Sequence, residues 1–474
     1  MFSRGTILPL ALVFLASSAI FVNIVLPSSE SNVSDKASEN TWTQKAPMPT
    51  PRSALSVAAV DGKIYALGGK TRGLNGFLLA TNEMYDPAND TWAAKAPMPT
   101  PRAFFTVAVF QNKIYCFGGL IGNSTQREQF WKGCTANEVY DPSTDTWETK
   151  APMPTARWRL QANTANGKIF LIGGDPNASL NEVYDPETDN WTAKAPILYN
   201  ETITYLAYPF KDTINYAASD GFTSAAIDNK IFWIGQAYSE SKGTKKLTLM
   251  YNPENDSWSP RTPPPEYSET YTAISTTGEW APKQIYVFGH GHIIHTNVAY
   301  NPVTDKWSQA KGIPTTNSEF SVAVADDQLY AIGGRYLYSA SAENEQYTPF
   351  GYGTIAPTIS VLTPQNGTST VKNSSLVFTL NRPALWMGYN MDCQNNMTLA
   401  GNITLGGLSQ GFHNLTVYVQ DTFGNSAASE TIFFTVAETA EPLPTILLGV
   451  AVIVVAFAVA FLLFYHRNLS LRKR

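Results

Sequence analysis

Cysteine and charge are both scarce in this chain. Three cysteines in 474 residues exclude a disulfide scaffold and a cysteine-rich zinc site. Charged residues make up only 15% of the sequence, the formal net charge is −5, and no basic stripe is present. Proteins that bind nucleic acids gather positive charge on one face, so this composition excludes a nucleic-acid partner.

A helical apolar period is also missing from most of the chain, and a repeat takes its place. Between residues 40 and 350 no stretch shows a convincing period of about 3.6 residues. The unit KAPMPTPR occurs at Lys45–Arg52 and again at Lys95–Arg102, and KAPMPTAR follows at Lys150–Arg157. A period of about 50 residues predicts an array of similar small sheets.

Each repeat contains four predicted strands separated by turns. A tryptophan strand leads through a proline-rich turn to an apolar strand, and the next strand ends in Gly-Gly. The motif Asn-Glu-hydrophobic-Tyr-Asp-Pro then forms a strand and begins the hairpin to the next tryptophan. The repeated tryptophans are Trp42, Trp92, Trp147, Trp191, Trp258 and Trp307.

Six such units predict a six-bladed β-propeller over residues 40–352. Radial repetition of four-stranded sheets leaves only short, protected sheet edges. The last copy, Ser318–Phe350, has three strands, and the first tryptophan strand, Asn40–Met48, arrives without strands of its own. We therefore expect the N-terminal strand 40–48 to complete the last sheet and close the ring.

These elements resemble the kelch repeat. The resemblance is carried by Gly-Gly, then Asn-Glu-x-Tyr-Asp-Pro, then Trp and Pro-Met-Pro, in that order, over residues 40–350. It implies a kelch β-propeller. Kelch propellers include substrate adaptors, glycan-active enzymes and surface proteins, so the fold alone does not choose a function.

A second domain is predicted over residues 356–437. Short strands separated by Asn-Gly, Gly-Gly and Gly-Asn turns indicate an antiparallel sandwich. The segment also resembles the immunoglobulin-like modules that lie beside the membrane in archaeal and bacterial surface proteins, which implies a spacer. The matching residues are Trp386–Tyr389, Gly411–His413, Val417, Tyr418, Asp421, Gly424 and Asn425.

The two chain ends predict export and a membrane anchor. Residues 446–465 are apolar and long enough to cross a bilayer, and a basic tail follows at 466–474, which places that tail in the cytoplasm. Residues 438–445 form a linker. Residues 1–27 are predicted as a signal peptide or an N-terminal membrane anchor, followed by a linker at 28–39. The prediction is thus an all-β cell-surface protein whose one C-terminal transmembrane helix has the lipid bilayer as its partner.

Two kinds of modification are candidates in an exported chain. Cys116 and Cys134 lie on or beside antiparallel neighbouring strands, so a disulfide between them is geometrically feasible. Asn-x-Ser/Thr sequences mark glycosylation candidates. The selected candidates are Asn89, Asn190, Asn366, Asn373, Asn396, Asn402 and Asn414.

The predicted ligand site lies at the mouth of the central channel. Alignment of the repeats places Arg52, Arg102 and Arg157 at equivalent positions on three adjacent blades, and Arg159 is near. An arginine fork binds carboxylates, so this side is expected to hold an anionic group. An alternative is that the arginines brace adjacent blades through backbone carbonyls. The opposite side of the mouth offers Tyr267, Glu269, Asn317 and Glu319.

No cofactor and no metal are predicted. His290 and His292 share one strand face and His295 follows, but no acidic partner is evident nearby, so these histidines are only secondary metal candidates. The glycine-rich pieces are strand ends, and none opens a helix as a phosphate-binding loop does.

The favoured function is non-catalytic binding of a surface glycan or protein, in adhesion, envelope organisation or capture. The alternative is an exported glycan-active enzyme of the epimerase, lyase or oxidase type. Such an enzyme needs a general acid or base near the channel, for which Glu269, Glu319, Tyr267 and His290 are candidates. A structural module of a surface layer is a third reading.

Overall fold

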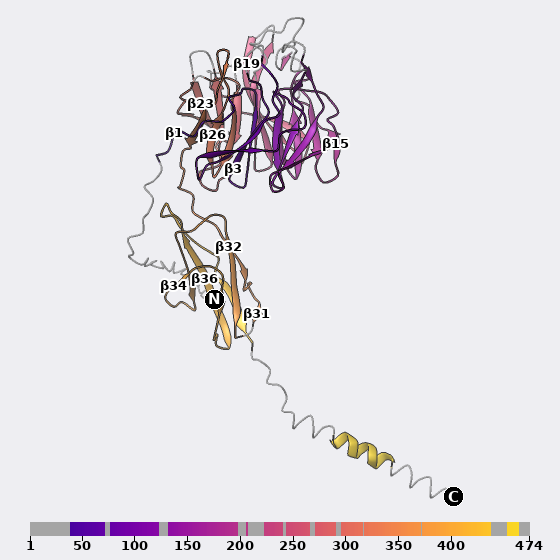
Figure 1. The fold of residues 1–474 in the computed structure, drawn as a ribbon. Helices are drawn as coiled ribbons and strands as arrows, with labels where there is room; N and C mark the ends of the chain where they lie inside the picture. Colours follow the sequence, from indigo (N-terminus) through magenta and orange to yellow (C-terminus); the bar gives the residue numbers. More distant parts are fainter. Residues whose placement is uncertain are drawn as a thin grey trace, which may run out of the picture.

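The computed structural model describes eleven stretches of the chain, and strands dominate them. These stretches are 38–71, 76–122, 131–197, 205–206, 222–239, 243–265, 271–290, 295–315, 317–370, 372–437 and 453–463. Because the described residues hold strands and one short helix, the all-β prediction is confirmed. The strands form a ring of sheets and a second, smaller domain on one side of the ring (Figure 1).

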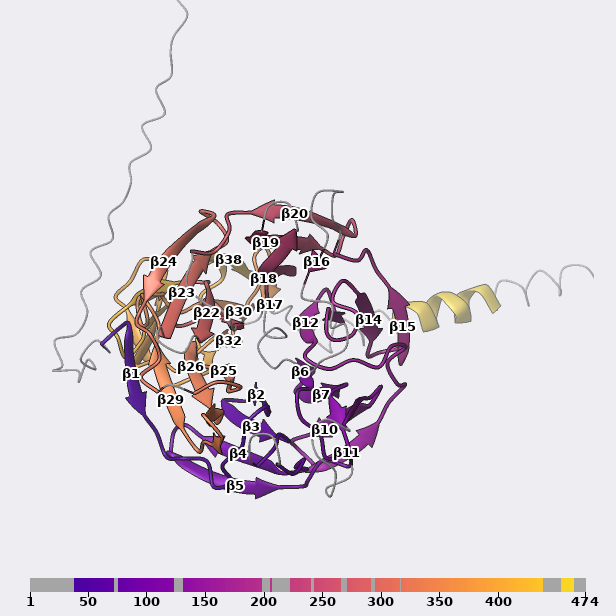
Figure 2. The same ribbon diagram turned by 90° about the horizontal axis from the view of Figure 1, so that it is seen from above.

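Six antiparallel sheets stand around the ring, with their first strands nearest the centre (Figure 2). Sheet 1 contains β2 (Ser56–Val60), β3 (Lys63–Leu67), β4 (Asn82–Asp86) and β5 (Thr91–Lys95). Sheet 2 contains β6 (Thr106–Phe110), β7 (Lys113–Phe117), β10 (Asn137–Asp141) and β11 (Thr146–Thr149). Sheet 3 contains β12 (Gln161–Ala165), β13 (Lys168–Ile172), β14 (Asn181–Asp185) and β15 (Asn190–Ala193).

The other three sheets follow the same order. Sheet 4 contains β17 (Phe222–Ile227), β18 (Lys230–Ser239), β19 (Gly243–Asn252) and β20 (Ser257–Arg261), with β16 (Tyr205–Leu206) beside β18. Sheet 5 contains β21 (Tyr271–Ser275), β22 (Ile285–His290), β23 (His295–Asn301) and β24 (Lys306–Ala310). Sheet 6 contains β25 (Ser321–Ala325), β26 (Gln328–Ile332), β29 (Asn344–Thr348) and β1 (Thr41–Gln44).

The outermost strand of sheet 6 comes from the other end of the ring sequence. Strand β1 pairs antiparallel with β29, and Trp42 lies opposite Tyr347. Two small hairpins extend from the ring between the second and third strands of their sheets. They are β8 (Leu120–Ile121) with β9 (Lys132–Gly133) in sheet 2, and β27 (Arg335–Tyr336) with β28 (Ser339–Ala340) in sheet 6.

The apolar core of the ring is divided among the spaces between neighbouring sheets. Between sheets 6 and 1, for example, Leu55, Val57 and Tyr85 of sheet 1 meet Tyr330 and Ile332 of sheet 6. A comparable cluster fills each of the other five spaces. Each sheet is therefore apolar on both faces, and burial of these faces holds the ring together.

A hydrogen-bonded clamp joins each sheet to its neighbour at the outer edge. In sheet 1, Asp90 Oδ1 accepts the Tyr85 hydroxyl at 2.6 Å and the Ala46 N–H at 2.8 Å. Trp92 Nε1 donates to the carbonyl of the same Ala46 at 2.8 Å. Ala46 belongs to the segment that leaves sheet 6, so both backbone polar groups of one residue of the preceding sheet are bonded to sheet 1.

The same clamp recurs at all six junctions, with its acceptor in the turn before the tryptophan strand. The acceptors are Asp90, Asp145, Asp189, Asp256, Asp305 and, in sheet 6, Asn40. The donating tryptophans are Trp92, Trp147, Trp191, Trp258, Trp307 and Trp42. The repeated tyrosine, aspartate and tryptophan of the sequence are thus the parts of one bonded unit.

The second domain consists of two sheets around one core. One sheet contains β30 (Ile359–Thr363), β32 (Ser374–Leu380) and β35 (Ile403–Leu405). The other contains β31 (Ser369–Thr370), β38 (Ile432–Val436), β36 (Gly411–Gln420), β33 (Trp386–Met391), β34 (Met397–Leu399) and β37 (Ser426–Ala428). Leu376, Leu415 and Val417 are fully buried between them.

The predicted membrane anchor is wrong. Within the predicted span 446–465, the structure describes a helix only over 453–463. No helix among the described residues is long and apolar enough to cross a membrane, since a span needs about 20 residues. The predicted location at a cell membrane, with a cytoplasmic C-terminal tail, is corrected accordingly. The predicted N-terminal signal segment 1–27 lies outside the described residues.

The clamps predict acid sensitivity. The tyrosine hydroxyl and the backbone N–H hold the pKa of Asp90, Asp145 and Asp305 below its usual range. A lowered folded-state pKa contributes stability above the unfolded value of about 3.9, and this contribution is lost as pH falls through the folded value. We expect the unfolding midpoint to drop as pH is lowered from about 5 to 3.

Sheet 6 supplies the control, because its acceptor is the uncharged Asn40. The triple variant Asp90→Asn, Asp145→Asn, Asp305→Asn should fold and lose less stability over the same pH interval than the parent. Thermal unfolding followed by circular dichroism measures both profiles. Parallel profiles would show that other groups cause the acid sensitivity.

Candidate functional site

The ring has two unlike faces. We call one the loop face: it carries the connections between second and third strands and the segments that enter the first strands. At this face Gly68 has a φ of 59°, and a Cβ there would lie 2.7 Å from the Arg102 carbonyl oxygen, so only glycine allows neighbouring sheets to meet so closely. The hairpin of β18 and β19 extends from this face, and the second domain lies against the opposite one (Figure 1).

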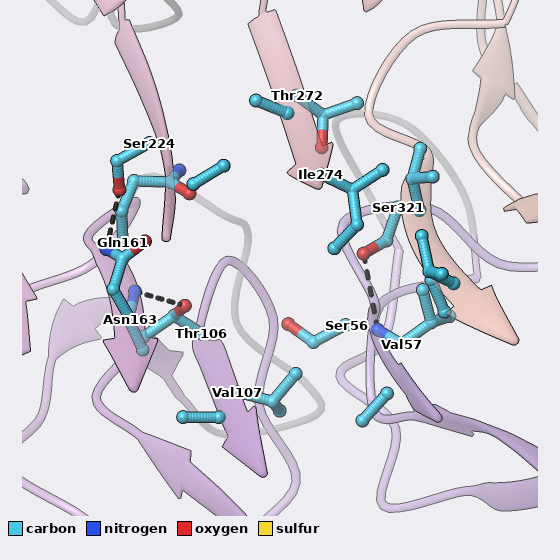
Figure 3. Close-up of a pocket in the computed structure, with 18 of the residues that line it drawn as sticks. Ser56, Val57, Thr106, Val107, Gln161, Asn163, Ser224, Thr272, Ile274 and Ser321 are labelled. Atoms are coloured by element: carbon cyan, nitrogen blue, oxygen red, sulfur yellow. Dashed lines mark hydrogen bonds between the residues drawn. The ribbon is translucent and has the colours of Figure 1, made fainter. Parts of the chain in front are cut away.

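A channel of about 660 Å³ runs between the first strands of the six sheets. Its wall is built mainly from small apolar and neutral polar side chains (Figure 3). Many of the polar groups join neighbouring strands: Asn163 Nδ2 donates to Ser224 Oγ at 2.7 Å, and Val57 N–H donates to Ser321 Oγ at 3.2 Å. Since these polar groups form hydrogen bonds to one another within the wall, the role of the deeper channel wall is primarily structural.

A rim of backbone hydrogen bonds borders the channel at the loop face, along sheets 6, 1, 2 and 3. Ala54 N–H donates to the Glu319 carbonyl at 2.9 Å, Phe104 N–H to the Ala54 carbonyl at 2.9 Å, and Arg159 N–H to the Phe104 carbonyl at 2.8 Å. All four residues have a positive φ, between 54° and 56°. Among the described residues that line the channel, charge is confined to Arg159 and Glu319 of this rim.

Glu319 is the centre of a charged cluster on the rim. Its carboxylate lies 2.9 Å from Arg335 Nε and 3.5 Å from Lys70 Nζ, and it accepts the Ser53 hydroxyl at 3.0 Å. Burial by itself would raise the pKa of Glu319, but Lys70, Arg335 and Arg159 together hold it below its usual range. The carboxylate is therefore ionised at neutral pH and serves as a fixed charge.

Aromatic rings lie beside these cations. Lys70 Nζ is 4.7 Å from the centre of the Phe104 ring, and the Arg159 guanidinium is 4.6 Å from the same ring. Arg159 also lies over Trp158 at 4.7 Å. Of the predicted site residues, the structure thus brings Arg159 and Glu319 to one rim, and it adds Lys70, Phe104, Trp158 and Arg335, which the sequence analysis did not select.

The three repeated arginines have a different role from the one predicted. Arg52, Arg102 and Arg157 are each 0% exposed, so they do not reach a ligand at the channel mouth. Arg157, for example, donates to Glu182 Oε2 at 2.6 Å and to the Gly173 carbonyl at 2.6 Å. The equivalent pairs are Arg52 with Glu83 at 2.5 Å and Arg102 with Glu138 at 3.0 Å.

This pairing accounts for the repeated Thr-x-Arg motif. The threonine two residues before each arginine donates its hydroxyl to the other oxygen of the same glutamate, at 2.5–2.7 Å. The bracing alternative is therefore the better description, although each arginine braces its own sheet through a glutamate as well as through a carbonyl. The glutamate belongs to the Asn-Glu-x-Tyr-Asp motif, which the sequence analysis used only to define the repeat.

Loss of the arginine and loss of the glutamate go together in sheets 4 and 5. The glutamate positions of sheets 4 and 5 hold Leu249 and Val298, which pair with Trp233 and Val287 on the neighbouring strands. The aligned arginine positions hold serine and tyrosine. Correlated loss of both partners is typical of a structural pair, since an unpaired buried charge is costly.

Sheet 6 keeps the glutamate without the arginine. Glu345 is 2% exposed and accepts the Thr315 hydroxyl at 2.7 Å. Asn317 stands at the arginine position and donates to Ser341 Oγ at 2.9 Å. Burial raises the pKa of Glu345 above its usual range. The predicted ligand residue Asn317 is itself buried, at 5% exposed, and supports the loop.

The predicted disulfide is not formed, since Cys116 and Cys134 are both buried free thiols. The register explains this. Cys116 lies opposite Glu138, four residues beyond Cys134 on the same segment. Four strand residues span about 13 Å, which is well beyond the Cα separation that a disulfide bridges.

Several predicted residues cannot be placed. Tyr267, Glu269 and His292 lie outside the described residues. His290 and His295 are paired through the backbone of β22 and β23, and only that backbone is described. Within the described stretches, no group of three or more His, Cys, Asp or Glu side chains is arranged to hold a metal ion.

The second domain contains a Ser-His-Asp contact that the sequence analysis did not find. His413 Nδ1 lies 2.7 Å from Asp392 Oδ2, and Nε2 lies 2.8 Å from the Ser409 carbonyl and 3.5 Å from the Ser409 hydroxyl. The hydrogen bond to the carbonyl raises the pKa of His413, with Asp392 adding to the effect. Because Nε2 donates to a carbonyl, it is not the free base that a nucleophilic serine requires.

Comparison with known proteins identifies the repeat. Residues 51–99 and 101–154, which contain sheets 1 and 2, match the Kelch motif family. Kelch repeats are therefore present in this chain, and the resemblance drawn from the sequence is confirmed at the level of the repeat.

Similar proteins cover only part of the chain. Beta-scruin of Limulus polyphemus is 36% identical over 135 residues, 28% of this chain and 14% of that protein. Kelch-like protein 35 of Mus musculus is 26% identical over 238 residues, 50% of this chain and 38% of that protein. This chain thus spans less than half the length of these relatives. A solved structure of YjhT is similar to 63% of this chain and 95% of its own, at a TM-score of 0.46 and 15% identity.

The buried pairs predict a stability effect that is separate from binding. Arg157→Met leaves Glu182 buried without its cation, which should lower the free energy of unfolding by about 3–5 kcal/mol. The double variant Arg157→Met, Glu182→Leu removes both charges, places leucine at the glutamate position as in sheet 4, and should recover much of that loss. Denaturant unfolding of the parent, both single variants and the double variant measures the coupling. Independent, additive losses would contradict the pairing.

Proposed function

We propose that this protein is a scaffold that binds a protein partner through the loop face of its ring. The observation that carries the proposal is the tip of the β27–β28 hairpin, Tyr336–Tyr338. Tyr336, Leu337 and Tyr338 are 55%, 62% and 72% exposed and follow one another directly. Large apolar side chains gathered in this way are typical of interaction surfaces.

The tip is braced from the channel rim. Arg335 Nε contacts Glu319 at 2.9 Å, Arg335 Nη1 donates to the Leu337 carbonyl at 3.0 Å, and the Arg335 N–H donates to the Ser318 carbonyl at 2.7 Å. A braced tip loses little conformational entropy on binding, which favours affinity. Tyrosines suit such a site because they offer large contact area and a polar end.

The rim beside the tip supports an anionic group on the partner. Lys70, Arg159 and Arg335 stand around the carboxylate of Glu319, so three cations from three sheets meet at this part of the rim. A carboxylate of the partner would contact the half-buried guanidinium of Arg159, which lines the channel mouth, whereas Lys70 is 2% exposed and only supports the cluster from within. A general-acid role for Glu319 is not favoured, because its lowered pKa keeps the proton off at neutral pH.

A glycan ligand is the second candidate. The observation in its favour is the set of rings at the rim, Phe104 and Trp158, beside the guanidinium of Arg159. Aromatic faces next to polar groups suit the apolar face of a sugar ring. An acidic sugar would combine this contact with the charge of the rim.

We further propose that the six sheets form a six-bladed kelch propeller over residues 40–352, closed by the N-terminal strand. The order of strands in the six sheets and the pairing of β1 with β29 support this assignment. For residues 356–437 we propose an immunoglobulin-like sandwich, which the two sheets around one core support. The seven asparagine glycosylation candidates stay predictions.

Binding should depend on the tyrosine tip. The double variant Tyr336→Ser, Tyr338→Ser should weaken binding to a captured partner by about tenfold or more, as expected for tyrosines at an interface centre. Val303→Ser is the matched control, because Val303 is 89% exposed but lies on a turn between third and fourth strands, away from the tip. Affinity capture from the native source, followed by titration of the captured protein, measures the effect.

A glycan panel that includes acidic sugars tests the second candidate with the same variants. Glycan binding that is retained by the tyrosine variant and lost in Arg159→Ala would move the function to the rim. A partner that binds the parent and the tyrosine variant equally would overturn the proposal.

A further inference from the structure

The contact between the ring and the second domain is built from a cluster of aromatic rings, of which Tyr352 is buried, and from a buried pair of charged groups. Trp280 belongs to the loop between β21 and β22, Tyr352 to the segment after β29, and Phe423 to the turn between β36 and β37. The Phe423 ring lies edge-on to both others, with ring centres 5.9 Å from Trp280 and 5.7 Å from Tyr352. Trp280 and Tyr352 are stacked at 6.3 Å. Three separate stretches of chain therefore share one aromatic cluster.

Arg382 connects this cluster to both parts of the molecule. It follows β32 in the second domain, and its guanidinium lies 4.8 Å over the Trp280 ring. Arg382 Nη1 donates to the Glu279 carbonyl of the ring at 2.6 Å, and Nη2 donates to Asp421 Oδ2 at 2.7 Å and to the Ile355 carbonyl. The side chains of Arg382 and Asp421 are 1% and 0% exposed.

The segment that connects the two parts is held between them. Gly353 N–H donates to the Trp280 carbonyl at 2.7 Å, and Asn425 Nδ2 donates to the Gly353 carbonyl at 2.8 Å. A Cβ on Gly353 would lie 2.6 Å from the Phe423 ring. The connection is therefore bonded on both sides and closely packed, unlike a flexible linker.

The loop that carries Trp280 is itself fixed to the ring. Asp327 of sheet 6 is 0% exposed and accepts backbone N–H groups from Thr277, Glu279, Trp280 and Ala281 at 2.5–3.0 Å. A carboxylate with this many donors orients the whole loop. Trp280 is thus presented to the second domain from a rigid base.

We propose that Trp280, Arg382 and Phe423 form a latch that holds the ring and the second domain as one rigid body. Domains joined by a short connection usually move relative to each other unless the interface is well packed and apolar. Here, separation would expose the aromatic cluster and would remove Arg382 from the Glu279 carbonyl and the Trp280 ring. Asp421 belongs to the same domain as Arg382, and its carboxylate, 2.7 Å from Nη2, holds the guanidinium in position for these contacts with the ring.

The latch has a functional consequence that does not depend on what the ring binds. The second domain lies on the face opposite the loop face (Figure 1). A rigid junction keeps the loop face pointing away from the second domain at a constant orientation. The second domain then acts as a fixed support for the ring.

Double electron–electron resonance on the full chain tests the latch, because it measures the distribution of distances between two nitroxide labels. Cys393 of the second domain is exposed and takes one label, and Val303→Cys, on an exposed turn of the ring, takes the other. Cys116 and Cys134 are buried, and burial raises the pKa of Cys116 to about 12, so this thiol resists labelling.

In the doubly labelled Val303→Cys protein, which is the parent here, the expected result is one narrow distance distribution. The distribution becomes broad when Trp280→Ala or Phe423→Ala is added. These variants leave no buried charge unpaired, and unchanged circular dichroism shows that they fold. Phe433→Ala, at an exposed position of the same domain, is the control that keeps the narrow distribution. A broad distribution in the parent, or a narrow one in both latch variants, overturns the proposal.

Discussion

The ring depends on one hydrogen-bonded unit that is repeated at every junction between sheets. In each copy a turn aspartate or asparagine accepts a tyrosine hydroxyl and the backbone N–H of one residue in the preceding sheet. A tryptophan donates to the carbonyl of that residue of the preceding sheet. Apolar contacts between sheets are not directional. The clamp supplies direction, because it bonds one particular residue of the preceding sheet to one particular turn, and so it fixes how neighbouring sheets meet.

Inside this frame, charge is used in two different ways. The buried pairs, such as Arg157 with Glu182, are formed within their own sheets, and their arginines have no exposed surface for a ligand. On the rim, Glu319 and Arg335 of sheet 6 form a cluster with Lys70 of sheet 1 and Arg159 of sheet 3, beside the mouth of the channel. Under the proposed function, specificity for a partner therefore rests on the few positions where the repeats differ.

The repeat allowed the elements of the fold to be predicted, but it misled the prediction of the site. Regularity revealed the strands and turns, because tyrosine, aspartate and tryptophan recur for structural reasons. The same regularity made Arg52, Arg102 and Arg157 appear functional, although the glutamate that recurs with them points to a structural pair. Arg335 and Tyr336–Tyr338 occur in one repeat only, so no periodic signal marked them. The apolar run near the C-terminus did not form the predicted long helix among the described residues.

Site-specific photocrosslinking in the native source tests the central claim most directly. A photoreactive residue in place of Leu337 lies at the tip of the loop face, and one in place of Val303 lies on an exposed turn elsewhere. The account predicts a defined covalent adduct with a protein at position 337, and no such adduct at position 303. Adducts at 303 alone, or at neither position under conditions where the protein is folded, would contradict binding through the loop face.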